Sequence, residues 1–390
     1  MYILTRYVIW EVLKFFLAAL AALTLVVTFG VVLQEGLKQG LPGTVMIRIM
    51  PCILPQVLGI TIPTSMLFSV CSVFGRMTGA NEVVAIKSAG ISPMAIVWPV
   101  IVLASFLSLG TVYMYELAAT QCKPAFQRIL AESVEDIAYS MLQRNHAYNS
   151  DQFAITVRGV QNPQRGGESP KLIDPTITIK GSSKIILRSA EAELHADLKA
   201  HLVRIVCRHN NVDIQQQGTG KIGLKSLGTE EIPIPIVIPP PDRYHQDWIA
   251  TKDVPVRVAE LEGVVRRLER LRDANQALGN PPSPKDAEKI AEQRQQINKL
   301  RAEPYRRWAN GFTCLCFALL GTPVAIRLRH ADVLTNFFVC FLPILALYYP
   351  LLMFSQGLST SGTLPPCSFW TANVLISIPA IFLLRRIVQR

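Results

Sequence analysis

Charged side chains are scarce in this sequence, and five long stretches have none. Of its 390 residues, 17% are charged and 50% are hydrophobic. A helix of a soluble protein seldom runs this far without a charge, because one of its faces meets water. We therefore exclude an ordinary soluble protein. The five uncharged stretches are Phe15–Leu33, Ile49–Gly75, Ser88–Tyr115, Trp308–Ile326 and Val333–Leu384.

These stretches predict six transmembrane helices, since a helix that crosses a bilayer needs about 20 apolar residues. The last stretch is long enough for two spans and is divided by the polar, Gly/Pro-rich segment Ser355–Ser368. The first span follows Arg6, as the apolar core of a signal peptide follows a basic flank. It is longer than such a core and five more spans follow, so we predict an uncleaved anchor.

Motifs for catalysis and nucleotide binding are also missing. The nearest approach to a Walker A loop is "GTGKI", which has Gln215 in place of the first glycine and Ile222 in place of the hydroxyl residue. Neither H-E-x-x-H nor G-x-S-x-G occurs. We predict that the chain is not an enzyme and binds no cofactor and no metal.

Paired acidic residues, typical of proton relays in membranes, are absent from the spans. This excludes a proton-coupled pump and leaves any driving energy to a partner. Six of the eight cysteines lie within or beside spans and are best explained as small packing residues. Cys122 and Cys207 lie in the outer segment, where a disulfide between them stays open, since spacing alone does not decide pairing.

The net charge of +11 has a distribution that predicts topology. With a cytoplasmic N-terminus, the short outer loops hold only Lys38 and Arg48, which follows the positive-inside rule. Both termini are then cytoplasmic, and the large segment after the third span lies outside. No basic motif interleaved with aromatic residues points to nucleic acid. The inner basic residues are Arg6, Arg76, Lys87, Arg327, Arg329, Arg385, Arg386 and Arg390.

The outer segment predicts a β-rich domain followed by a helical hairpin. Over 118–255, short runs such as "TITIK", "HLVRIVCRH" and "NVDIQQQ" alternate with turn signals such as "RHNN", which is typical of an antiparallel sandwich or barrel. The proline-rich "IPIPIVIPPPD" suits an edge strand or an exit linker. Residues 256–303 read as two helices around "NPPSP". This hairpin either returns the chain to the bilayer or binds a partner. The expected membrane regions are then 1–117 and 304–390.

A short charged helix near 82–89 lies between the second and third spans. Asn81 is a good N-cap, Glu82 suits the positive end of a helix, and Gly90 is a typical C-terminal stop. Val83 and Ile86 share a face with Lys87. Such a face suits a groove in another protein, although a capped turn on the membrane surface explains the composition equally well.

Three segments resemble the LptF/LptG permeases of lipopolysaccharide export. They are "RYV" near the start, "IPTSMLFSVCSVFGRMTGANEVVAIKSAGISP", and "EPYRRWANGFTCLCFALLGTPVAI". The order of three spans, an outer β-domain and three more spans is similar too. The resemblance covers essentially the whole chain and implies an α-helical membrane protein with six transmembrane helices, an extracytoplasmic β-jellyroll domain and a helical hairpin.

The resemblance also implies partners. The short helix would be a coupling helix that docks into a dimeric LptB-like ATPase, with Glu82 facing a basic residue. Around it we assign Asn81, Val83, Ile86 and Lys87 to ATPase binding. A second LptF/LptG-type subunit would complete the cavity, with gates between the first span of one chain and the fifth of the other. An LptC/LptA-like periplasmic jellyroll protein would receive the lipopolysaccharide or a related glycolipid from this inner-membrane permease.

The chain departs from the family at the outer end of the first span, where members carry lysines that meet lipid phosphates. Here only Lys38 follows that span. Lys38, Arg306 and Arg307 take the phosphate-binding role, or they merely anchor the spans at the interface. Two other functions stay open: a permease of this design for another glycolipid, and a membrane-anchored envelope binding or structural protein.

Overall fold

The computed structural model divides the chain into two compact units. The first comprises Met1–Thr28, Ile53–Pro124 and Tyr244–Arg390, and the second Phe29–Cys52 and Ala125–Arg243. The structure describes residues 2–39, 41–133, 139–143, 146–149, 153–161, 170–179, 184–197, 202–216, 219–225, 229–234, 249–277, 284–328 and 333–389.

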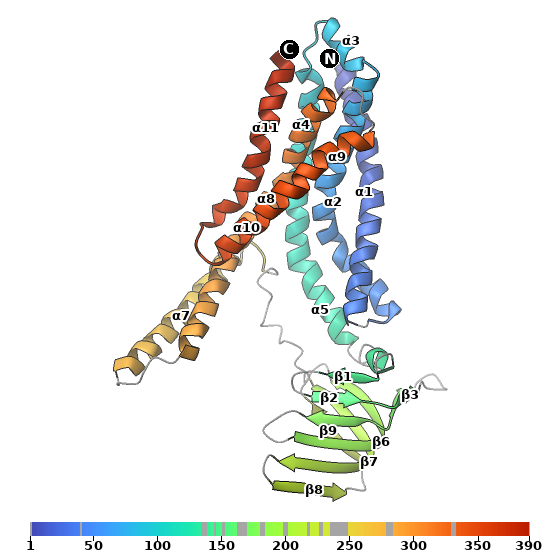
Figure 1. Ribbon diagram of the computed structural model, residues 1–390, viewed down its shortest axis with the longest axis vertical. Coiled ribbons are helices and arrows are strands. Elements are labelled where there is room, and N and C mark those ends of the chain that lie inside the picture. The colour runs from blue at the N-terminus through green and yellow to red at the C-terminus, as the bar shows by residue number, and fades with distance from the viewer. Residues whose placement is uncertain are drawn as a thin grey trace. The chain divides into compact units, whose positions relative to one another are not determined.

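Long helices dominate the chain (Figure 1). The N-terminal helical elements are α1 (Tyr2–Gln39), α2 (Gly43–Gly79), α3 (Glu82–Ser88), α4 (Met94–Leu117), the π-helical η1 (Ala118–Cys122) and α5 (Lys123–Glu132). Those after the strands are α7 (Val254–Ala277), α8 (Pro284–Arg327), α9 (Val333–Pro343), the π-helical η3 (Ile344–Tyr348), α10 (Tyr349–Thr360), the 3₁₀ turn η4 (Pro366–Phe369) and α11 (Trp370–Gln389).

Six of the described helical stretches are long and apolar enough to cross a membrane, which confirms the predicted number of spans. A helix is suited to this because all its internal backbone groups bond within the segment. The stretches are Ile3–Leu37, Gly43–Gly79, Met94–Leu130, Asp286–Arg327, Leu334–Thr360 and Pro366–Ile387.

These spans differ in how much of their surface the chain itself covers. In the second span 78% of the most apolar stretch is buried, but only 17% in the first and in the fifth. Leu25 of α1 is 71% exposed, and Met353 of α10 is 70% exposed. Such apolar surfaces require either lipid or another protein against them.

One buried cluster joins α1, α2, α3, α4, α8 and α11. Because lipid tails are as apolar as these side chains, close packing holds the cluster together, rather than exclusion of water. Gly311 allows the close approach of α8 to α4: a Cβ added there would lie 2.2 Å from Cγ2 of Val112. Members of the cluster include Val8, Val12, Met66, Val70, Val83, Val100, Cys314, Ala318 and Leu384.

The fifth span is not one regular α-helix. Its middle, η3, is π-helical and lies between Pro343, which ends α9, and Pro350, in the first turn of α10. The sequence predicts a kink at these prolines; the structure shows a π-helical segment between them. Tyr348 of η3 is 2% exposed and shares a 2.6 Å hydrogen bond with Thr313 of α8.

Helices α7 and α8 pack side by side in opposite directions. Arg294 pairs with Glu269, and Arg301 pairs with Glu262, so residue numbers rise along one helix as they fall along the other. Val258, Val265, Ile297 and other apolar side chains fill the seam between them. Helix α8 then continues through Pro304 into the fourth span, so the border expected between 303 and 304 lies within one helix.

The second unit contains an antiparallel sheet. Its strands are β1 (Ala147–Asn149), β2 (Phe153–Thr156), β3 (Gly159–Gln161), β4 (Lys171–Ile173), β5 (Thr176–Ile179), β6 (Lys184–Asp197), β7 (Leu202–Gln216), β8 (Thr219–Lys225) and β9 (Thr229–Ile234). The two long strands β6 and β7 pair along their length. On its other edge, β6 pairs with both β5 and β4. On its other edge, β7 pairs with both β8 and β9.

Two details of the sheet bear on the sequence predictions. The prediction of a turn at "RHNN" is wrong, because β7 runs through these residues. Asn210 pairs with Ser189 of β6, and Asn211 pairs with Arg188. The long partner strand supplies hydrogen bonds that outweigh the local turn preference. Pro233 lies in β9, and among the described strands β9 pairs with β7 alone. This edge position suits Pro233, because proline has no backbone N–H to donate to a second neighbouring strand. Residues 235–242 of the proline-rich run, and the Cys207 side chain, fall outside the described residues.

Candidate functional site

Helix α3 lies at the end of the first unit that also holds the N-terminal end of α1 and the C-terminal end of α11 (Figure 1). Its C-terminus is as predicted. Gly90 has φ of +76°, its N–H donates to the Lys87 carbonyl, and the N–H of Ile91 donates to the Ile86 carbonyl. This is a Schellman motif, which the left-handed conformation of glycine makes inexpensive.

The N-terminus of α3 differs from the prediction. Asn81 occupies the N-cap position, but its backbone is left-handed, with φ of 57°, and its side chain makes no capping hydrogen bond. A side chain caps a helix from an extended backbone, and the left-handed turn after Gly79 prevents this. Asn81 therefore contributes a conformation that asparagine tolerates well, which lets the chain reverse between α2 and α3.

The face of α3 assigned to ATPase binding points largely inward. Val83 is 4% exposed and belongs to the buried cluster, and Ile86 packs against the same cluster. The Lys87 ammonium donates to the carbonyl of Ile387 in α11 over 3.1 Å. Contact of Val83 with a partner stays a prediction that this burial does not favour, because the chain's own helices cover the side chain.

The outer face of α3 carries different residues. Val84 is 39% exposed, and Ala85 and Ser88 are exposed too. Glu82 is half-buried, and no hydrogen bond or ion pair to its carboxylate occurs within the part of the chain that the structure describes. The surface offered by α3 is therefore a small apolar patch with one acidic group at its edge. We call Glu82, Val84, Ala85 and Ser88 the outer face of α3.

An ion pair holds the end of α2 that leads into α3. Arg76 donates to Glu11 of α1 over 2.6 Å, and its guanidinium lies 5.9 Å from the ring of Phe15. Lys14 lies 3.5 Å from the same carboxylate. Arg76 is 44% exposed, so the pair adds little to stability.

Arg307, predicted to bind lipid phosphate, is committed elsewhere. Its side chain is 5% exposed and lies 2.7 Å from the Glu116 carboxylate of α4. It also donates to the Ile249 carbonyl over 2.8 Å and to the Thr251 hydroxyl over 3.2 Å. Direct contact of Arg307 with lipid stays a prediction that these contacts do not favour, because they leave its side chain only 5% exposed.

The same cluster holds the second predicted arginine. Arg306 donates to Glu303 over 2.9 Å, and Glu303 also lies 3.7 Å from Arg307. Two guanidinium groups thus face two carboxylates, those of Glu116 and Glu303. Arg306 is 28% exposed and stays a candidate for contact with lipid. Lys38 lies in α1, but its side chain is outside the described residues.

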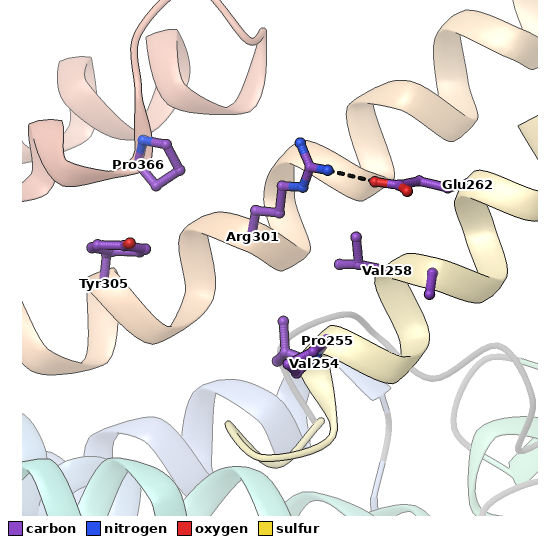
Figure 2. A pocket seen from close by; sticks show the side chains of 8 residues that line it. Val254, Pro255, Val258, Glu262, Arg301, Tyr305 and Pro366 are labelled. Carbon is purple, nitrogen blue, oxygen red and sulfur yellow. Dashed lines mark hydrogen bonds and ion pairs between the residues drawn. The ribbon is translucent and has the colours of Figure 1, made fainter.

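An open groove of about 440 Å³ lies beside the seam of α7 and α8 (Figure 2). Val254, Pro255, Val258 and Ala259 of α7 form an apolar wall, and Pro366 of η4 lies across from them. Figure 2 shows the ion pair of Arg301 and Glu262 near Val258, with Tyr305 farther along α8. A partner-binding role for the hairpin stays a prediction.

Sequence reasoning missed Glu116 and Thr251, and it did not distinguish the buried face of α3 from the exposed face. Glu116 ends the uncharged stretch of the third span, which marks it as a boundary residue but not as the partner of Arg307. A charge at a span border is usually an anchor. Only the folded chain shows that Thr251 donates its backbone N–H and its hydroxyl to this one carboxylate.

Comparison with known proteins identifies one family. The family model described as "Lipopolysaccharide export system permease LptF/LptG" matches residues 6–386, nearly the whole chain. A comparison with curated proteins found no match.

Proposed function

Because the chain belongs to the LptF/LptG family of lipopolysaccharide export permeases, we propose that it takes lipopolysaccharide or a related glycolipid from the inner membrane, driven by a separate ATPase. The family and the six apolar helices make it a multi-pass inner-membrane permease component. In the proposed topology both termini and α3 are cytoplasmic. The sheet, as part of a β-jellyroll, is then periplasmic.

The observation that carries this proposal is the construction of α3. It has seven residues, which are too few for a stable helix alone, yet its inner face is anchored in the core while its outer face is left uncovered. An anchored helix with an uncovered apolar patch suits docking into a groove of another protein. We propose an LptB-like ATPase dimer as that protein, with Glu82 facing a basic residue.

The first and fifth spans support a second permease subunit. Both leave most of their apolar surface uncovered by this chain, whereas the second span is largely buried. A partner of LptF/LptG type would cover part of these surfaces and enclose a cavity for lipid. The lipid would pass to the β-domain and then to an LptC/LptA-like jellyroll protein.

Paired substitutions on the two faces of α3 test the docking. Val84→Asp puts a charge into the contact, and we expect it to weaken ATPase association by about 2 kcal/mol, roughly thirtyfold. Glu82→Ala removes one charged pair at the rim, so we expect a smaller loss. Neither should change the unfolding temperature. Val83→Asp is the matched control, since a charge in the buried cluster should destabilise the fold itself.

The measurement is the amount of ATPase that co-purifies with each full-length variant from native membranes, alongside thermal unfolding. Full association in Val84→Asp would rule out α3 as the docking element. Recovery of no ATPase with the unaltered chain would instead favour an envelope binding or structural protein. Lipids extracted with the same preparation identify the substrate and separate lipopolysaccharide from another glycolipid.

A further inference from the structure

Lys87 connects two elements that are far apart in sequence. Its ammonium donates to the backbone carbonyl of Ile387, so a side chain of α3 is bonded to the last turn of α11. The only covalent connections of α3 lead to α2 and α4. The Lys87 bond therefore adds a third attachment, to the sixth span.

The chemistry of a helix end explains this contact. The last four carbonyl groups of an α-helix have no partner within the helix, and they carry the negative end of its dipole. Ile387 is two residues from the end of α11 at Gln389. A lysine ammonium is a charged donor, so it satisfies one of these carbonyls and is favoured by the dipole.

Apolar packing reinforces the same attachment. Leu384 of α11 is 8% exposed and belongs to the buried cluster that contains Val83, and Ile387 packs against that cluster, as does Ile86. The inner face of α3 and the last two turns of α11 thus pack into the same apolar cluster, and the Lys87 bond adds a direct polar contact between them. The outer face of α3 takes no part in this attachment.

We infer that Lys87 is a positioning residue that couples the outer face of α3 to the sixth span through the carbonyl of Ile387. This rests on the proposed function, in which an ATPase moves α3. A push on the outer face then displaces α11 together with α2 and α4. Lys87 acts through α11 and touches neither nucleotide nor lipid.

Two substitutions of Lys87 test the attachment. Lys87→Met keeps the length and apolar stem but removes the donor, whereas Lys87→Arg keeps a charged donor. Spin-labelled unnatural amino acids at the exposed positions Ala89, which lies outside the outer face of α3, and Gln389 report the distance between the end of α3 and the end of α11 in the full chain. With lysine or arginine at position 87, we expect a narrow distance distribution that ATP does not change. With methionine at position 87, we expect a broad distribution.

Transport measured in proteoliposomes, with the co-purified ATPase, gives the functional result. We expect Lys87→Met to retain the ATPase but to transport about tenfold less lipid per ATP hydrolysed, within the range typical of coupling between sites. Lys87→Arg should restore transport. A narrow distribution in Lys87→Met, or unchanged transport per ATP, would overturn the inference.

Loss of the ATPase from Lys87→Met would also overturn it, because Lys87 would then be a docking residue. If no ATPase co-purifies with the unaltered chain, the proposed function fails. The distance measurement still decides in that case whether Lys87 attaches α3 to α11.

Discussion

Replacing Arg307 with methionine removes the centre of the cluster formed by Glu116, Ile249, Thr251 and Glu303. The Arg307 side chain is 5% exposed and makes three hydrogen bonds of 2.7 to 3.2 Å to Glu116, Ile249 and Thr251. Methionine fills a similar volume but leaves Glu116 without its cation and the Ile249 carbonyl without this donor. The variant therefore tests whether the arginine is structural or available to lipid.

The magnitude follows from the burial of the two partners. Removing one member of a buried ion pair costs roughly 3–5 kcal/mol, because the remaining charge is left uncompensated. Glu116 is 33% exposed, so water recovers part of that cost. We expect a loss near the lower end of the range, about 3 kcal/mol in the free energy of unfolding.

Thermal or denaturant unfolding of the purified chain measures this loss, and hydrogen exchange of residues 249–253 locates it. Arg306→Met is the matched control, since Arg306 is more exposed and should cost about 1 kcal/mol or less. Adding Glu116→Gln to Arg307→Met should recover part of the stability by removing the uncompensated charge. Equal stability of Arg306→Met and Arg307→Met would refute the reasoning.

Two further predictions concern packing between spans. Gly311→Ala should destabilise the chain by roughly 1–3 kcal/mol, since the new Cβ would meet both Cγ2 and the backbone of Val112. Gly110 has open space around it, so the control Gly110→Ala should be neutral or stabilising. Thermal unfolding of the two variants measures the difference. Thr313→Val should cost about 1–3 kcal/mol by leaving the Tyr348 hydroxyl buried without this partner, and faster hydrogen exchange in η3 would show it. Unchanged exchange there would mean that Thr313 does not hold η3.

The features of this protein that depend on local composition follow from the sequence. Five uncharged stretches, the last of them long enough for two spans, predict the six apolar helices, because a bilayer demands length and apolarity from each span separately. The end of α3 at Gly90 likewise follows from one residue whose left-handed conformation suits a helix C-terminus. The irregular part of the fifth span, η3, lies between Pro343 and Pro350, where local composition also makes a regular α-helix unfavourable.

Only the tertiary structure decided how those elements use their surfaces. A helical period places Val83 and Ile86 on one face of α3, but whether that face is inner or outer depends on α1, α4 and α11, which lie far away in sequence. Arg307 likewise reads as a free cation until Glu116 and Thr251 are brought beside it. Long-range packing selects the partner of each side chain, and periodicity along one segment contains no information about that choice.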